Sequence, residues 1–165
     1  MESIVVDTKI FIDGCTFEGN DYLHCHLILT KILDGVISLG VDNKGEILEE
    51  YNNNLMRLSN NPIAKLLIKL IINDAKFSTG ERRIRTYKPI SKQSVRGLLK
   101  MGFHRDYIKF VRIAPKTDLK AIFSSNSQSF LNYDYSSWMQ ENLGVSIKQP
   151  SDFPQFILEI SNNKS

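Results

Sequence analysis

The sequence predicts an α/β protein with a central, mostly parallel β-sheet. Short apolar runs alternate along the chain with longer segments of helical spacing, which is typical of strands joined by helices. The first apolar run, 3–6, ends at the carboxylate of Asp7 and leads into a segment of helical spacing. A second run, 36–41, follows a helix that is predicted between Asn20 and Gly35. Together these segments predict a right-handed βαβ unit with parallel strands.

Length and composition fit a single globular domain. The chain has 165 residues, of which 42% are hydrophobic and 24% charged. We expect one domain over residues 1–160 and a flexible tail over 161–165. The net charge of +3 permits a nucleic-acid partner without indicating one. No basic segment precedes an apolar core at the start, and no apolar run approaches the ~20 residues of a membrane span. We therefore expect a cytoplasmic protein with no membrane partner.

The cysteines and histidines do not suggest a metal or disulfide site. Cys15 and Cys25 lack the spacing of a metal motif, so we expect reduced thiols that pack in the core. His24 and His26 flank Cys25, but adjacent residues of a helix point in different directions. The sequence contains no second pair of such ligands to complete a site.

A predicted amphipathic helix over 42–55 carries the second acidic candidate. Its apolar stripe includes Ile47, Tyr51 and Leu55, and Glu50 lies at one border of that stripe. A carboxylate at this border can lean into the crevice at the carboxyl edge of a parallel sheet, where ligands collect. Glu49 is turned further toward solvent and is the poorer candidate.

The remaining segments continue the alternation of helices and strands. Helices are expected at 63–73, 91–101, 104–114 and 130–143 and from 149 onward, with strands at 119–124 and 145–148. Segment 77–89 is expected to be a loop, and it holds the densest basic cluster of the chain. The candidate contacts in this loop are Arg82, Arg83, Arg85, Tyr87 and Lys88.

The order of these segments resembles the PIN domain nuclease family. The matching residues are Ile4 to Thr8, Ile47 to Tyr51 with Leu55, Asp106 with Phe110 and Ala114, Asp118 to Ser124, and Leu143 to Phe153. The resemblance implies a three-layer αβα sandwich and a Mg²⁺- or Mn²⁺-dependent endoribonuclease that cleaves single-stranded RNA. Asp7, Glu50 and Asp106 would be its catalytic metal ligands, with Asn126 as a further ligand. A role as a toxin or defence nuclease, a protein inhibitor or antitoxin and a homodimer are also implied.

Two departures from the family pattern define an alternative hypothesis. Asn126 stands where the family usually carries an acid, and Lys9 stands where it commonly has Asn or Ser. Lys9 could contact substrate phosphate or could pair with Asp7 and displace the metal. The alternative is a PIN-like module that no longer cleaves and binds RNA or a protein partner. Asp118 or Asp134 could compensate for the missing acid.

The basic loop fits the proposed substrate, because single-strand binders combine phosphate-tracking cations with a stacking aromatic. Lys9 and Ser124 are the further RNA-binding candidates, and Lys92 and Arg96 could extend the basic surface. A solvated loop that balances nearby acids explains the same charges. A third hypothesis is an interaction protein without a nucleic-acid role.

Overall fold

The computed structural model describes residues 1–58, 60–73 and 83–164. Its sheet has five strands in the order β3-β2-β1-β4-β5, and every neighbouring pair is parallel. The strands are β1 (Ser3–Val6), β2 (Ser38–Asp42), β3 (Ile84–Tyr87), β4 (Ala121–Phe123) and β5 (Ser146–Lys148). The first strand along the chain is therefore the centre of the sheet.

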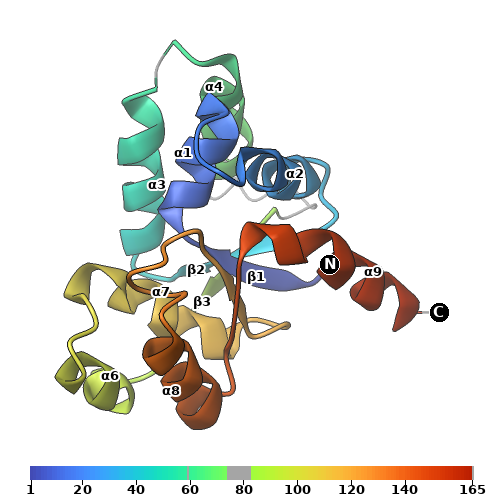
Figure 1. Ribbon diagram of the computed structural model, residues 1–165. Helices are drawn as coiled ribbons and strands as arrows, with labels where there is room; N and C mark the ends of the chain where they lie inside the picture. The colour runs from blue at the N-terminus through green and yellow to red at the C-terminus, as the bar shows by residue number, and fades with distance from the viewer. Residues whose placement is uncertain (59, 74–82, 165) are drawn as a thin grey trace.

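Helices cover both faces of the sheet. The α-helices are α1 (Thr8–Thr16), α2 (Tyr22–Leu33), α3 (Glu46–Met56), α4 (Pro62–Leu67), α6 (Arg96–Lys100), α7 (Ile108–Ile113), α8 (Tyr133–Leu143) and α9 (Phe153–Asn162). Shorter helical segments are η1 (Ile68–Ile72), η2 (Lys92–Val95), η3 (Arg105–Tyr107), η4 (Ala114–Lys116) and η5 (Pro150–Asp152). Figure 1 shows α1 to α4 and α9 on one side of the sheet and α6 to α8 on the other. The predicted three-layer αβα sandwich is confirmed.

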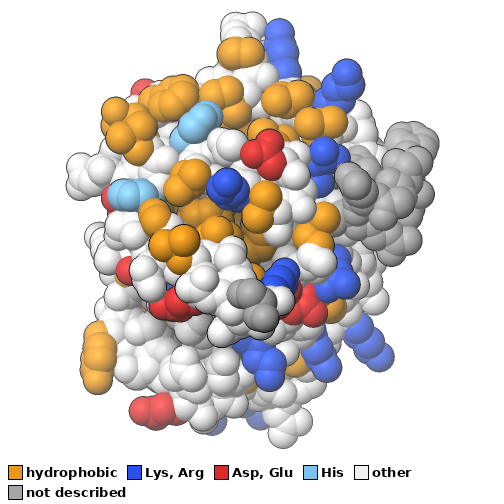
Figure 2. Space-filling model, turned by 90° about the vertical axis from the view of Figure 1, so that its right-hand side faces the viewer, with side chains coloured by type: hydrophobic (Ala, Val, Ile, Leu, Met, Phe, Trp, Pro, Cys, Tyr) orange, Lys and Arg blue, Asp and Glu red, His pale blue; other side chains and the backbone are white. Residues whose placement is uncertain are grey.

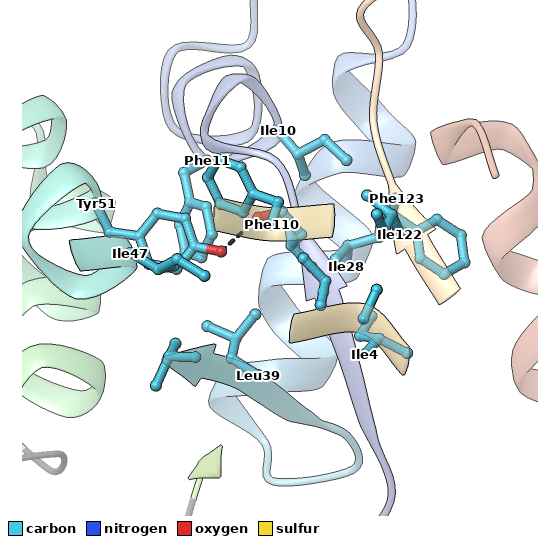
Figure 3. Packing of buried hydrophobic residues seen from close by; sticks show 14 of the residues in the cluster. Ile4, Ile10, Phe11, Ile28, Leu39, Ile47, Tyr51, Phe110, Ile122 and Phe123 are labelled. Atoms are coloured by element: carbon cyan, nitrogen blue, oxygen red, sulfur yellow. Dashed lines mark hydrogen bonds between the residues drawn. The ribbon is translucent and has the colours of Figure 1, made fainter. Parts of the chain in front are cut away.

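The core is centred on β1, whose four residues are all buried. Phe11, Tyr51 and Phe110 pack together from separate elements (Figure 3). The rings of Phe11 and Tyr51 lie 4.4 Å apart between centroids. The Tyr51 hydroxyl donates a hydrogen bond to the Val6 carbonyl, which satisfies a polar group inside the core. This bond fixes α3 against the carboxyl end of β1.

The predicted helix start after Asn61 is confirmed by its cap, whereas the helix predicted from Asp42 begins later, at Glu46. The Asn61 side chain accepts hydrogen bonds from the backbone of Ile63 and Ala64, and Pro62 opens α4. Asp42 is instead the last residue of β2, and its carboxylate accepts hydrogen bonds from the backbone of Glu46 and Ile47 at the start of α3. These polar residues occupy the positions where helix ends leave backbone groups without intrahelical partners.

The expected loop over 77–89 is wrong for Ile84–Tyr87, which forms the edge strand β3. Its charges suggest a loop, but an edge strand has only one strand neighbour, so its polar side chains can face solvent. Ile84 is the buried member of the strand, while Arg85 and Thr86 are exposed. The part of the expected loop over 77–82 lies outside the described residues.

Apolar side chains also gather on one outer face of the molecule. Figure 2 shows this face, which carries α9 and the neighbouring α2, with a basic side chain among the apolar ones. Leu23 of α2 and Leu158 of α9 are 64% and 58% exposed.

Cys15 and Cys25 pack inside as free thiols, and burial raises the pKa of each to about 12. Among the helices of the described ranges, none is both long and apolar enough to cross a membrane.

Candidate functional site

The candidate site lies at the carboxyl ends of β1 and β4. These strands are neighbours at the point where the strand order reverses, which is where ligands bind in open α/β sheets. Asp7 directly follows β1 and Ser124 directly follows β4. The Ser124 hydroxyl donates a 2.9 Å hydrogen bond to Asp7 Oδ2, and the Asp7 amide donates to the Phe123 carbonyl at 2.9 Å. Two segments far apart in sequence are therefore joined at this carboxylate.

Asp7 is a buried carboxylate with a perturbed pKa. Only 2% of the residue is exposed. Burial is the largest influence, and together with the negative charge of Glu50 it raises the pKa of Asp7 from 3.8 to about 6. Hydrogen bonds from Ser124 and from the backbone of Lys9 and Thr8 work in the opposite direction. Asp7 therefore lies close enough to Glu50 for the two charges to influence each other.

Glu50 completes a small polar cluster beside Asp7. The Thr8 hydroxyl donates to Glu50 Oε1, and the Lys109 ammonium forms an ion pair with Glu50 Oε2. The Lys109 and Glu50 side chains are each 22% exposed. Because Tyr51 is anchored to Val6, the preceding residue Glu50 is held at the border of the buried stripe, as the sequence predicts. Two of the predicted acids therefore share this edge of the sheet.

Asp106, the third predicted acid, does not join the cluster. It lies in η3, where its backbone amide donates to His104 Nδ1. Its side chain is 79% exposed, and its carboxylate lies 3.5 Å from His104 Nδ1. This tight turn presents Asp106 to solvent, while α7 places Lys109 at Glu50.

The predicted set of acidic ligands does not assemble. Within residues 1–58, 60–73 and 83–164, no group of three His, Cys, Asp or Glu side chains lies close enough to hold a metal ion. Asp134 is exposed in the first turn of α8. Asp118 lies before β4, at the amino ends of the strands, whereas Asp7 lies at their carboxyl ends. Of the predicted ligands, all of which lie in the described residues, Asp7 and Glu50 are therefore the two acids that share this edge.

Asn126 has a structural role that its sequence position does not indicate. Its amide oxygen accepts hydrogen bonds from the backbone of Gln128 and Ser129 at 3.1 and 3.2 Å. Its amide nitrogen donates to the Tyr107 hydroxyl at 3.3 Å, and its backbone amide donates to Ser124 at 3.0 Å. The oxygen that a metal would require is therefore already used to fix the turn after β4.

Lys9 pairs with Asp13 rather than with Asp7. The ammonium lies 2.6 Å from Asp13 Oδ2, one helical turn further along α1. The Lys9 side chain is 49% exposed, whereas that of Asp13 is 10% exposed. Of the two roles that the sequence leaves open for Lys9, the pairing with Asp7 is not found. Its contact with substrate phosphate stays a prediction.

The basic cluster is directed away from the site. Arg85 forms a 2.5 Å ion pair with Asp118, and the Tyr87 hydroxyl lies 2.6 Å from Ser3 Oγ. Ser3 begins β1 and Asp7 follows its end, so these contacts lie about 13 Å from Asp7 at ~3.3 Å per strand residue. The pKa of Asp118 is lowered because hydrogen bonds from Ser3 and the charge of Arg85 outweigh its partial burial, which acts to raise it.

The other basic candidates are held separately. Arg83 Nε donates to the Leu33 carbonyl at 2.7 Å, at the end of α2. Lys88 is exposed and lines a surface depression with Ser91 and Lys116. Arg82 lies outside the described residues. The described members of the cluster therefore do not form one surface that faces Asp7 and Glu50.

Sequence reasoning missed Lys109 and Thr8, which contact both oxygens of Glu50. A signal for Lys109 exists, because it directly precedes the buried Phe110 and so lies at the border of a buried stripe. The same argument singles out Glu50. Attention to the acidic residues of the 104–114 helix leads to Asp106 instead.

Comparison with known proteins assigns no family to this arrangement. No protein-family model matches the sequence, and no curated protein matches it.

Proposed function

We propose that this chain is a metal-dependent endoribonuclease of PIN type, acting on single-stranded RNA, whose centre is built on Asp7 and Glu50. The observation that carries the proposal is the carboxylate pair at the strand reversal. Asp7 is buried there, and its pKa is raised to about 6 by burial and by Glu50. A divalent cation would relieve this repulsion. The order of the acidic segments supports the same assignment.

The residues at this edge fit a hard divalent cation that is held by fewer protein ligands than the resemblance implies. Mg²⁺ is commonly held by one or two carboxylates, with waters and substrate phosphates filling its other positions. Asp7 and Glu50 would hold it, Ser124 orients Asp7, and Thr8 orients Glu50. When bound, such an ion offsets the negative charge of the phosphodiester and lowers the pKa of coordinated water. Asp106 and Asn126 are not ligands in this proposal.

Cleavage of a labelled single-stranded RNA in Mg²⁺ or Mn²⁺ tests the proposal. Asp7→Asn and Glu50→Gln should each lower the cleavage rate at least about 100-fold, because each removes a charge that the cation requires. Asp106→Asn is the matched control and should retain the wild-type rate, since its side chain is 79% exposed. Wild-type protein that cleaves equally well in chelator would contradict the metal requirement.

A second candidate is the PIN-like module that binds RNA or a protein partner without cleaving. Two observations favour it: Lys109 occupies one oxygen of Glu50, and the amide oxygen of Asn126 is used within its own turn. RNA that binds equally in chelator and is not cleaved in metal would support the module. The cytoplasmic location, the homodimer and the protein inhibitor or antitoxin stay predictions.

A further inference from the structure

We propose that the Lys109 ammonium is a built-in competitor of the divalent cation at Glu50. It neutralises the carboxylate in the absence of metal and must move away when metal binds. This inference rests on the proposed metal-dependent function and adds a residue that limits metal binding at the same site.

Both oxygens of Glu50 are engaged by neighbouring side chains. Thr8 contacts Oε1 through a neutral hydroxyl, while Lys109 contacts Oε2 through a full positive charge. A hydroxyl can rotate and offer its own oxygen to a cation, but an ammonium has only donors. Lys109 is therefore the neighbour that a cation at Glu50 would have to displace.

The fold keeps Lys109 beside Glu50. The next two residues of α7, Phe110 and Val111, are fully buried, so the helix has a fixed orientation. The ammonium also lies 5.7 Å from the centroid of the Phe110 ring, a distance at which a cation interacts favourably with an aromatic face. The Lys109 side chain is only 22% exposed, so this ion pair is weakly screened by solvent.

Lys9, which follows Asp7 and Thr8 in the chain, does not have the same effect. Its ammonium is paired with Asp13 at 2.6 Å. Lys109 therefore supplies the positive charge on Glu50. Because like charges repel strongly in a partly buried site, loss of this charge should favour a divalent ion.

Calorimetric titration with Mn²⁺ alone, without RNA, tests the inference on the full chain. Lys109→Met keeps the length of the side chain and removes its charge, so it should bind Mn²⁺ about tenfold more tightly than wild type. Lys109→Arg keeps the charge and should bind as weakly as wild type. Lys100→Met is the matched control for overall charge, because Lys100 is exposed at the end of α6, and it should leave the affinity unchanged.

The outcomes separate this inference from the proposed function. Equal Mn²⁺ binding by wild type and Lys109→Met would overturn the competition and leave the metal site intact. Absence of Mn²⁺ binding in both proteins would overturn the competition and the metal-dependent function together. Lys109→Gln replaces Lys109→Met if the latter does not fold, with the same expected gain in affinity.

A measurement on wild-type protein provides a second test. Mn²⁺ should increase the rate at which an amine-acetylating reagent modifies Lys109, because the displaced ammonium becomes accessible. Modification of Lys100 should stay constant in the same samples. An unchanged rate at Lys109 under conditions where Mn²⁺ binds would contradict the displacement.

Discussion

Ser124 Oγ donates a 2.9 Å hydrogen bond to Asp7 Oδ2, although the two residues are 117 positions apart in the sequence. The bond joins the carboxyl ends of β1 and β4, the two neighbouring strands between which the strand order reverses. It also stabilises the ionised form of Asp7, which burial disfavours. The bond therefore connects the stability of the fold to the charge state of the site.

Ser124→Ala should raise the pKa of Asp7 further and lower the free energy of unfolding at pH 7.5. A hydrogen bond to a charged group contributes about 1.5 to 3 kcal/mol, and its loss leaves the carboxylate less satisfied. Carbon-13 NMR of the Asp7 carboxyl carbon and urea unfolding measure the two effects. Ser127→Ala, at an exposed position of the following turn, is the control and should change neither. An unchanged Asp7 pKa would contradict the assigned bond.

The raised pKa of Asp7 predicts that its contribution to stability falls as pH rises. The folded state holds the Asp7 proton up to about pH 6, whereas the unfolded chain releases it near 3.8. Between these values the folded state binds more protons, so the contribution is present below about pH 4 and is lost through pH 6. The shift corresponds to on the order of 3 kcal/mol.

Asp7→Asn removes this dependence because the amide does not ionise. The stability difference between variant and wild type, measured by urea unfolding, should therefore grow in favour of the variant from pH 4.5 to 7.5. A difference that stays constant over this range would show that Asp7 has an ordinary pKa in the folded protein.

Gly40→Ala should destabilise the fold by about 1 to 3 kcal/mol, because a larger side chain overpacks this part of the core. A Cβ atom at Gly40 would lie 2.5 Å from Thr117 Cγ2. Thr117→Ser removes that methyl group and keeps the hydroxyl that donates to the Ala114 carbonyl. Urea unfolding of the double variant should therefore show a smaller loss than the sum of the two single variants. If the losses of the two single variants add up in the double variant, the Thr117 methyl group is not what the new Cβ atom at position 40 clashes with.

Arg85→Ala should return the pKa of Asp118 toward its ordinary value and should cost less than about 1 kcal/mol of stability. The ion pair is half exposed, with side-chain exposures of 43% and 40%, so solvent weakens it. An NMR titration of the Asp118 carboxyl measures the first effect. Arg96→Ala, an exposed change in α6, is the control. No movement of the Asp118 pKa would mean that Ser3 alone sets it.

The sequence predicts much of the fold because local chemistry decides those elements. The apolar run before Asp7 is a buried strand, and Asn61 with Pro62 begins a helix, as their residue types require. β3 could not be predicted in the same way, because two exposed positions of an edge strand hide its pattern among charged residues. Pairing with β2, rather than composition, makes this segment a strand.

The site was partly predictable for a related reason. The position of Asp7 follows from the end of a strand, and that of Glu50 from the border of an apolar stripe. Asp106 and Lys109 lie on the same predicted helix, but the chain forms a tight turn at η3 before α7 begins. A change of less than one helical turn decides which of the two side chains reaches Glu50, and spacing alone does not resolve it.

Mn²⁺ calorimetry on wild type, Glu50→Gln and Asp106→Asn tests the central claim most directly. The two variants each neutralise one acid, but only Glu50 lies beside Asp7. We expect Mn²⁺ binding by wild type and Asp106→Asn and its loss in Glu50→Gln. Loss of binding in Asp106→Asn with retention in Glu50→Gln would contradict the account, because the cation would then lie at a different part of the chain.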